Sequence, residues 1–265
     1  MISSVRPALI PCLALALWAA HAAAENTVTI GGSGGSKVNI NASGATNGVI
    51  DLYQVSSSVP GEENQAGTAL NPIVQSGSGH VARIGQGANW NGNVWVPGTA
   101  VANNTASIRQ TGAGADNALI VQTSSGNSAT ITQYGAAATA SITQGGAGGH
   151  TATIETLNTY VGAGVIVNQT GASNRAYITG MSGGGASVDQ SGTGGYVNLA
   201  NQTSGQLNIS QQGTNNGITV ENYGAGASAG KILSITQTGV GGAETVFNPS
   251  PAPDGPGYST AYPTP

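Results

Sequence analysis

Residues 106–144 read ASIRQTGAGADNALIVQTSSGNSATITQYGAAATASITQ, and one five-residue pattern recurs in them. Its copies run over 106–110, 118–122, 129–133 and 140–144, each with Ala first, Ile third and Gln fifth. Apolar positions alternate with polar or small ones, which predicts a β-strand with one buried face and one solvent-facing face. Gly, Asn and Ser separate the copies and turn the chain at little steric cost. The segment is therefore predicted to alternate strand and turn.

The same pattern extends over most of the chain at a spacing of about 11 residues. Downstream copies begin at Ala152, Val165, Ala176, Ala186, Val197, Leu207, Ile218 and Leu233, and upstream copies begin at Val28, Val38, Ile50, Asn71, Ala82 and Val94. Two successive strands make one flattened coil, and a single coil buries too little apolar surface to offset the entropy of ordering its backbone. The coils must therefore stack. We predict an all-β, amyloid-like β-solenoid of about 18 short strands in roughly nine coils over residues 25–240.

The first, third and fifth residues of each copy are predicted to point inward. A buried Gln amide without partners is costly, but stacked coils let each amide donate to the next, as in cross-β ladders. The predicted inward ladder, or amyloid core, consists of Ala106, Ile108, Gln110, Ala118, Ile120, Gln122, Ala129, Ile131, Gln133, Ala140, Ile142, Gln144, Gln169, Gln190, Gln211 and Gln237.

Composition argues against other classes of protein. The chain has 43 Gly and 6% charged residues, so it lacks both the bulky side chains of one large core and the high charge typical of disorder. A formal net charge of −4, thinly spread, offers no basic patch for nucleic acid and no acidic run for a cationic partner.

The two ends differ from the repeats. Residues 1–24 place Arg6 before an apolar run and finish in small residues, which predicts a secretory signal peptide. Cys12, the single cysteine, lies inside it, so the mature chain is expected to have no disulfide and no membrane span. Residues 241–265 are rich in Pro, which donates no backbone hydrogen bond, and are predicted to be a flexible tail.

Several features interrupt the pattern without indicating a catalytic site. Residues 55–70 and 90–98 are irregular and predict bulged coils, loops or a capping insertion. His80 and His150 lie in Gly-rich links without carboxylate or cysteine companions at ligand spacing. We therefore expect exposed turn residues, and no catalytic residue, metal site or cofactor. Thr130 and Thr153 suggest an ordered-water or ice-binding column, which is not sustained along the predicted face.

The repeats resemble those of the curlin family, in which a strand ending in Gln is followed by a Gly-rich turn, Asn, a spacer, Ala and a second strand ending in Gln. Residues 122–133 match this spacing closely, and residues 105–239 carry the resemblance best. The resemblance implies a secreted subunit that polymerises with itself into extracellular fibres for adhesion and biofilm. It also implies a nucleator subunit and an outer-membrane secretion pore as partners, and leaves open whether this chain is the major or the nucleating subunit. The alternative is a non-polymerising solenoid that acts as a surface adhesin or as a ligand- or ice-binding module.

Overall fold

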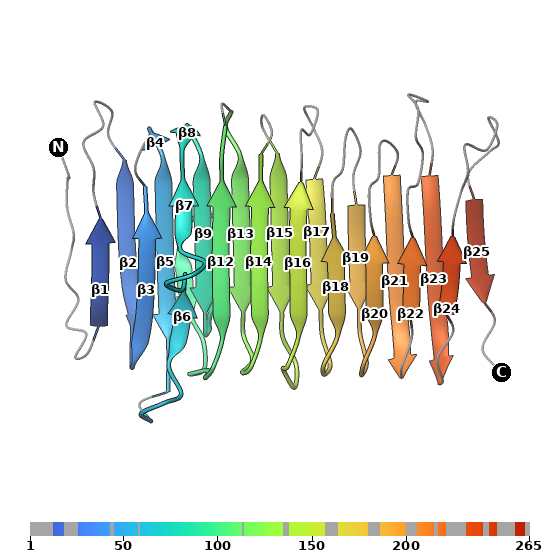
Figure 1. The fold of residues 1–265 in the computed structure, drawn as a ribbon. Coiled ribbons are helices and arrows are strands. Elements are labelled where there is room, and N and C mark those ends of the chain that lie inside the picture. Colours follow the sequence, from blue (N-terminus) through green and yellow to red (C-terminus); the bar gives the residue numbers. More distant parts are fainter. Residues whose placement is uncertain are drawn as a thin grey trace.

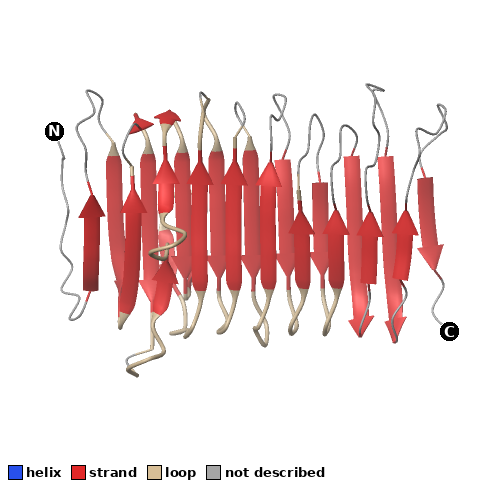
Figure 2. Cartoon of the chain, viewed as in Figure 1, coloured by secondary structure: helices blue, strands red, loops and turns tan. Residues whose placement is uncertain are grey.

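The computed structural model is a β-solenoid in which two long parallel sheets face each other (Figure 1). The structure describes residues 13–18, 26–42, 45–57, 59–112, 114–134, 138–156, 164–179, 186–199, 206–214, 217–220, 232–240, 244–247 and 258–262. Within these ranges all regular secondary structure is strand (Figure 2). The same ranges hold no helix of the length and hydrophobicity that a membrane span requires.

The first sheet has eleven strands and is called here the eleven-stranded sheet. It consists of β1 (Leu13–Trp18), β3 (Ser36–Asn41), β6 (Asn64–Ala66), β7 (Ile73–Gln75), β12 (Thr105–Gln110), β14 (Ser128–Gln133), β16 (Thr151–Thr156), β18 (Arg175–Ile178), β20 (Tyr196–Leu199), β22 (Gly217–Val220) and β24 (Glu244–Phe247).

The facing sheet has ten strands and is called the ten-stranded sheet. It consists of β2 (Thr27–Ser33), β5 (Val49–Val55), β9 (Val81–Gln86), β13 (Asn117–Gln122), β15 (Thr139–Gln144), β17 (Gly164–Gln169), β19 (Ala186–Gln190), β21 (Gln206–Thr214), β23 (Ile232–Val240) and β25 (Tyr258–Tyr262). Two short pairs lie outside the main sheets: β4 (Ala45–Thr46) with β8 (Gly77–Ser78), and β10 (Ala88–Trp90) with β11 (Trp95–Pro97).

Successive strands alternate between the sheets, so that each coil contributes one strand, or one interrupted strand, to each. In the described part of the chain the coils run from β2 with β3, through β13 with β14, to β23 with β24. Stacked strands are in register: Ala129 faces Ala106 and Ala152, and Ile131 faces Ile108 and Ile154. The predicted β-solenoid is confirmed.

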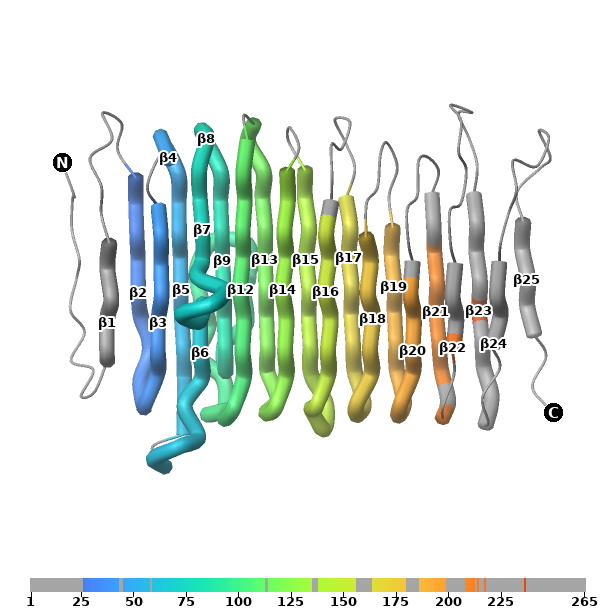
Figure 3. Tube along the Cα trace, viewed as in Figure 1, coloured from blue at the N-terminus to red at the C-terminus, as the bar shows by residue number. Residues whose placement is uncertain are grey.

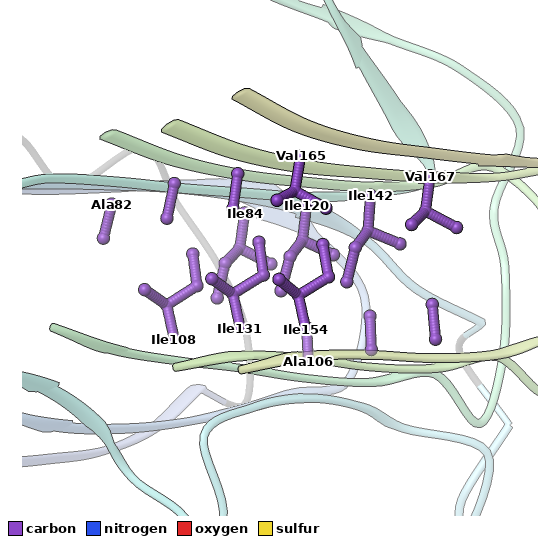
Figure 4. Packing of buried hydrophobic residues seen from close by; sticks show 14 of the residues in the cluster. Ala82, Ile84, Ala106, Ile108, Ile120, Ile131, Ile142, Ile154, Val165 and Val167 are labelled. Carbon is purple, nitrogen blue, oxygen red and sulfur yellow. The ribbon is translucent and has the colours of Figure 1, made fainter. Parts of the chain in front are cut away.

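The interior is a narrow layer of Ile, Val and Ala columns between the two sheets (Figure 4). Ile108, Ile131 and Ile154 of the eleven-stranded sheet project toward Ile120 and Ile142 of the ten-stranded sheet, and each is at most 1% exposed. One Ile and one small residue per strand fill the space, so that no bulkier side chain is needed.

The copy predicted to begin at Asn71 is an interrupted strand. Ala66 in β6 and Ile73 in β7 occupy the first and third inward positions of this half-coil, facing Val38 and Ile40 of β3. Residues 67–72 loop out between the two pieces, in front of the stack in Figure 3. Asn71 itself is exposed, so the prediction that it begins the strand is wrong.

The copy predicted to begin at Val94 is also wrong. Residues 88–97 form an antiparallel hairpin instead of a coil strand, and Val94 and Val96 are exposed. Gly92, with a φ of 101°, allows the tight turn, and the Asn91 side chain accepts the backbone N–H of Val94. The alternation at Val94–Val96 resembles a coil strand because residues 95–97 do form a strand, β11. That strand pairs with β10 and not with a strand of the two main sheets.

Parts of both termini are described as backbone only. β1 lies within the predicted signal peptide and pairs with β3, whereas the remaining residues of 1–24 lie outside the described residues. β24 and β25 lie within the predicted Pro-rich tail and pair with β22 and β23. The stack of strands therefore continues past Val240. The signal peptide stays a prediction, as does the flexibility of the rest of the tail.

Candidate functional site: the inward amides and the coil corners

The residues predicted to form the inward ladder occupy equivalent places in the stack. The pattern Ala, Ile and Gln side chains of the four copies in 106–144, together with Gln169, Gln190 and Gln211, are at most 2% exposed. Gln237 continues the column in β23, in register with Gln211, but its side chain lies outside the described residues. The fifth position of these copies thus places a polar amide beside the apolar columns.

The amides of the ten-stranded sheet form a continuous hydrogen-bonded chain. Each Gln Nε2 donates to the Oε1 of the Gln in the next coil, over distances of 2.8–3.0 Å from Gln86 onward. The chain runs through Gln54, Gln86, Gln122, Gln144, Gln169, Gln190 and Gln211. All the donors point the same way along the solenoid, so this amide chain has a direction.

The same amides also connect the two sheets. Gln122 Nε2 donates to the Thr105 carbonyl at 3.2 Å, and Gln144 Nε2 donates to the Ser128 carbonyl at 3.2 Å. Gln169 repeats the contact with Thr151 at 3.1 Å. Each acceptor is the first residue of a strand in the eleven-stranded sheet. One side chain therefore binds the amide of the next coil and also connects its strand to the preceding strand in the facing sheet.

Among the described side chains of the eleven-stranded sheet, no such chain forms. Gln75 and Gln110 donate to backbone carbonyls of Val49 and Val81, and the buried amide of Gln133 has no hydrogen-bond partner at either atom. The residue in register with Gln133 in the next coil is Thr156, which has no amide to continue a ladder. The two faces of the interior are therefore chemically unequal.

The coil corners carry a second polar column, at the position two residues before each Ala. In the links that enter the eleven-stranded sheet, Asn104, Asn127 and Asn174 lie there, and each Oδ1 accepts the backbone N–H of the next corner at 2.8–3.1 Å. Asn127 also donates to the Ser124 carbonyl at 2.7 Å. These side chains replace the strand ladder where the backbone turns.

Both histidines occupy the same corner position, and the expectation that they are exposed turn residues is wrong. His80 and His150 are 0% exposed. His150 Nδ1 accepts the Asn174 N–H at 3.2 Å, and its Nε2 lies 2.7 Å from the Gly145 carbonyl. Burial lowers the pKa of His150, with the backbone contacts opposing the shift. The signal that could have placed them is their spacing of two residues before Ala82 and Ala152.

His80 has an acidic neighbour that His150 lacks. Its Nδ1 accepts the Asp116 N–H at 3.3 Å and lies 3.5 Å from Asp116 Oδ2, with both side chains 0% exposed. Asp116 Oδ1 accepts the Ala138 N–H at 2.9 Å, whereas Oδ2 is buried without a hydrogen-bond partner. Burial raises the pKa of the Asp116 carboxyl, and the Ala138 N–H and His80 oppose this effect.

The β10–β11 hairpin lies against the outer face of the ten-stranded sheet. A Cβ on Gly85 would lie 2.2 Å from Trp95 Cζ3, so the indole sits directly on that glycine. Trp90 packs against Trp95 with ring centroids 5.0 Å apart and also lies under the Arg83 guanidinium at 4.8 Å. Val121, at an outward position of β13, is only 6% exposed. The hairpin therefore covers the outer face near β9 and β13.

Comparisons with known proteins agree with this repeat geometry. A family model described as the curlin associated repeat matches residues 102–135, the segment that contains β12, β13 and β14. Searches of curated proteins and of solved structures found no match. Residues 102–135 are thus similar to the curlin associated repeat, and the resemblance of this chain to the curlin family is confirmed.

Proposed function

We propose that this chain is a secreted structural subunit that assembles with copies of itself into extracellular curli-type amyloid fibres for adhesion and biofilm matrix. The observation that carries the proposal is the parallel, in-register stacking of coils that continues through the described strands. Each inner coil is stabilised by a coil on both sides, whereas a terminal coil has a neighbour on one side only. Another copy of the chain supplies the missing neighbour.

The terminal strands provide the surface for this addition. Among the described strands β2 pairs only with β5, and β24 pairs only with β22, so each keeps one unpaired edge. An exposed edge templates the addition of another strand. Parallel addition continues the Ala, Ile and Gln columns, whereas antiparallel addition would reverse their order and place Gln opposite the small residue. We therefore expect parallel, head-to-tail growth.

The low charge of the chain favours this stacking. Like charges that superpose in neighbouring layers are destabilising. The outward column that contains Arg109 continues with Thr132 and Glu155 in the next two coils, so like charges do not superpose there. Layers can therefore approach at the spacing of a hydrogen-bonded sheet, about 4.8 Å.

The curlin resemblance adds partners and a location to the proposal. A nucleator subunit would start the fibre, and an outer-membrane pore would export the chain after it crosses the inner membrane. The fibre would lie at the cell surface. No catalytic role, cofactor or nucleic-acid partner belongs to the proposal.

The test is assembly of the purified mature chain, followed by thioflavin fluorescence and electron microscopy. We expect fibres after a lag that preformed fibre fragments shorten, because a fragment supplies open coil edges. A chain that stays monomeric and strand-rich at every concentration would contradict the proposal and favour a non-polymerising adhesin or an ice-binding module. Thr130 and Thr153 are adjacent in register on the outer face, but Tyr177 follows them, so ice binding would have only a short Thr column.

A further inference from the structure

His150 connects three consecutive turns through its backbone N–H and its buried ring. Its backbone N–H donates to Asn127 Oδ1 at 3.0 Å, and its Nδ1 accepts the Asn174 N–H at 3.2 Å. Its Nε2 lies 2.7 Å from the Gly145 carbonyl, which can only accept a hydrogen bond. The ring must therefore carry its proton on Nε2 and leave Nδ1 free to accept. This tautomer is the neutral imidazole.

Protonation removes the acceptor on which the corner depends. An imidazolium carries N–H groups on both nitrogens, so Nδ1–H would point at the Asn174 N–H, and neither group could accept the other's proton. Burial makes the cation costly as well. The charged residues of the adjacent strands offer no compensation, because Glu155 and Arg175 point outward and are half-buried and exposed, respectively. The groups that contact the ring are the backbone N–H of Asn174 and the carbonyl of Gly145, and the backbone of Gly171 also lies beside it.

His80 occupies the equivalent place on the other side of the solenoid but has an acidic neighbour. Asp116 Oδ2 lies 3.5 Å from His80 Nδ1 and has no hydrogen-bond partner. No acidic side chain contacts the His150 ring among the described residues, so the two histidines differ in the charge beside the ring.

We propose that His150 is an acid-sensitive latch. Its protonation breaks the contact between the turns that precede β16 and β18 and loosens the coils around them. Acidification below about pH 6 weakens this part of the solenoid, because the unfolded corner takes up a proton near the ordinary histidine pKa and the folded corner does not. The latch is a property of the folded coil. Its consequence, slower growth and easier dissolution of fibres in acid, rests on the proposed function above.

The variant His150→Asn provides a matched test, since Asn127 and Asn174 already serve as acceptors at this position in the adjacent coils. Amide hydrogen exchange is measured by mass spectrometry at pH 7.5 and pH 5.0, corrected for intrinsic rates. The exchange is measured on the full mature chain, either soluble or in fibres. The measurement can therefore be made even if fibres do not form. In the wild type we expect protection of residues 145–156 and 171–178 to fall by up to about thirtyfold at pH 5.0, for an exposed histidine pKa of 6.5.

The expected pattern across the variants is specific. His150→Asn should keep the protection of the wild type at pH 7.5 and lose its acid response. His80→Asn should retain the acid response of residues 145–156, because it lies at a different corner. An acid response of the same size in His150→Asn, or a wild type whose protection in these segments does not change between the two pH values, would overturn the latch.

Discussion

Replacing Gln144 with Met removes one member of the amide chain while keeping a side chain of similar length. Three hydrogen bonds are lost, two of them buried and the third partly buried: from Gln122 at 2.9 Å, to Gln169 at 2.9 Å and to the Ser128 carbonyl at 3.2 Å. Each is worth about 1–1.5 kcal/mol net; Gln169 Oε1 loses its donor in the interior, whereas Gln122 Nε2 keeps the Thr105 carbonyl. We therefore expect a loss of about 3–5 kcal/mol in the free energy of unfolding.

Gln133 supplies the matched control. It occupies the same strand position in the eleven-stranded sheet, it is 0% exposed, and neither amide atom has a partner. Gln133→Met removes a buried polar group that makes no hydrogen bond, so it should be neutral or stabilising by about 1–2 kcal/mol. The two substitutions are chemically identical and differ only in the sheet that contains them.

The assay is denaturation by guanidinium chloride, followed by far-UV circular dichroism, with all proteins compared in the same state of assembly. The account predicts a much lower midpoint for Gln144→Met and an unchanged or higher midpoint for Gln133→Met. Equal losses in both variants would refute the one-sided amide chain. An unchanged midpoint for Gln144→Met would refute its contribution to stability.

Three further substitutions test the corners and the hairpin. Asn127→Ala should cost about 2–3 kcal/mol because it removes both an acceptor and a donor at a buried corner; thermal unfolding at wild-type temperature would contradict this. Gly85→Val should displace Trp95 and shift tryptophan emission to longer wavelength, since the new Cβ overlaps the indole; an unchanged spectrum would argue against the packed hairpin. Asp116 has a raised pKa, so its folded form holds protons that the unfolded chain releases, and its contribution to stability falls as the pH rises above 3.8. Asp116→Asn should keep the Oδ1 acceptor, remove the buried charge and raise the urea midpoint at pH 7; a midpoint below that of the wild type would show that the charged carboxyl is not a cost there.

The sequence is sufficient to predict the solenoid because its signal is repeated. The Ala, Ile and Gln positions of β12 to β15 recur with the same internal spacing, and the structure aligns them in register. Any single copy is a weak indication of a strand, but many copies in phase restrict the fold to stacked coils. The prediction at Val94 is wrong because alternation alone does not identify the pairing partner of a strand. The prediction at Asn71 is wrong because Ala66 fills the first inward position, ahead of a loop that the pattern does not show.

The asymmetry of the interior was harder to predict, although its cause is visible in the sequence. Thr156 replaces Gln at the fifth position of β16, which ends any amide ladder in the eleven-stranded sheet after Gln133. The pattern treats Gln110 and Gln122 alike, because it does not show which neighbour each amide meets. Hydrogen-bond partners depend on the separation and tilt of the side chains, which a one-dimensional pattern does not contain.

The buried histidines show a different limit. A Gly-rich link suggests exposure, but His80 and His150 lie two residues before the inward Ala, where the chain turns back over the interior. The corner column becomes apparent only when the links are aligned with the strands, because Asn, Asp and His then occupy one position and share the ability to accept a hydrogen bond. The Trp95 contact with Gly85 joins the β10–β11 hairpin to β9 and has no periodic signal in the sequence.

The most direct test of stacked, self-templating coils is X-ray fibre diffraction from aligned assemblies of the mature chain. The account predicts a meridional reflection near 4.8 Å from the spacing of stacked strands and an equatorial reflection near 10 Å from the facing sheets. A chain that yields no fibres, or fibres whose diffraction lacks the 4.8 Å meridional reflection, would contradict it.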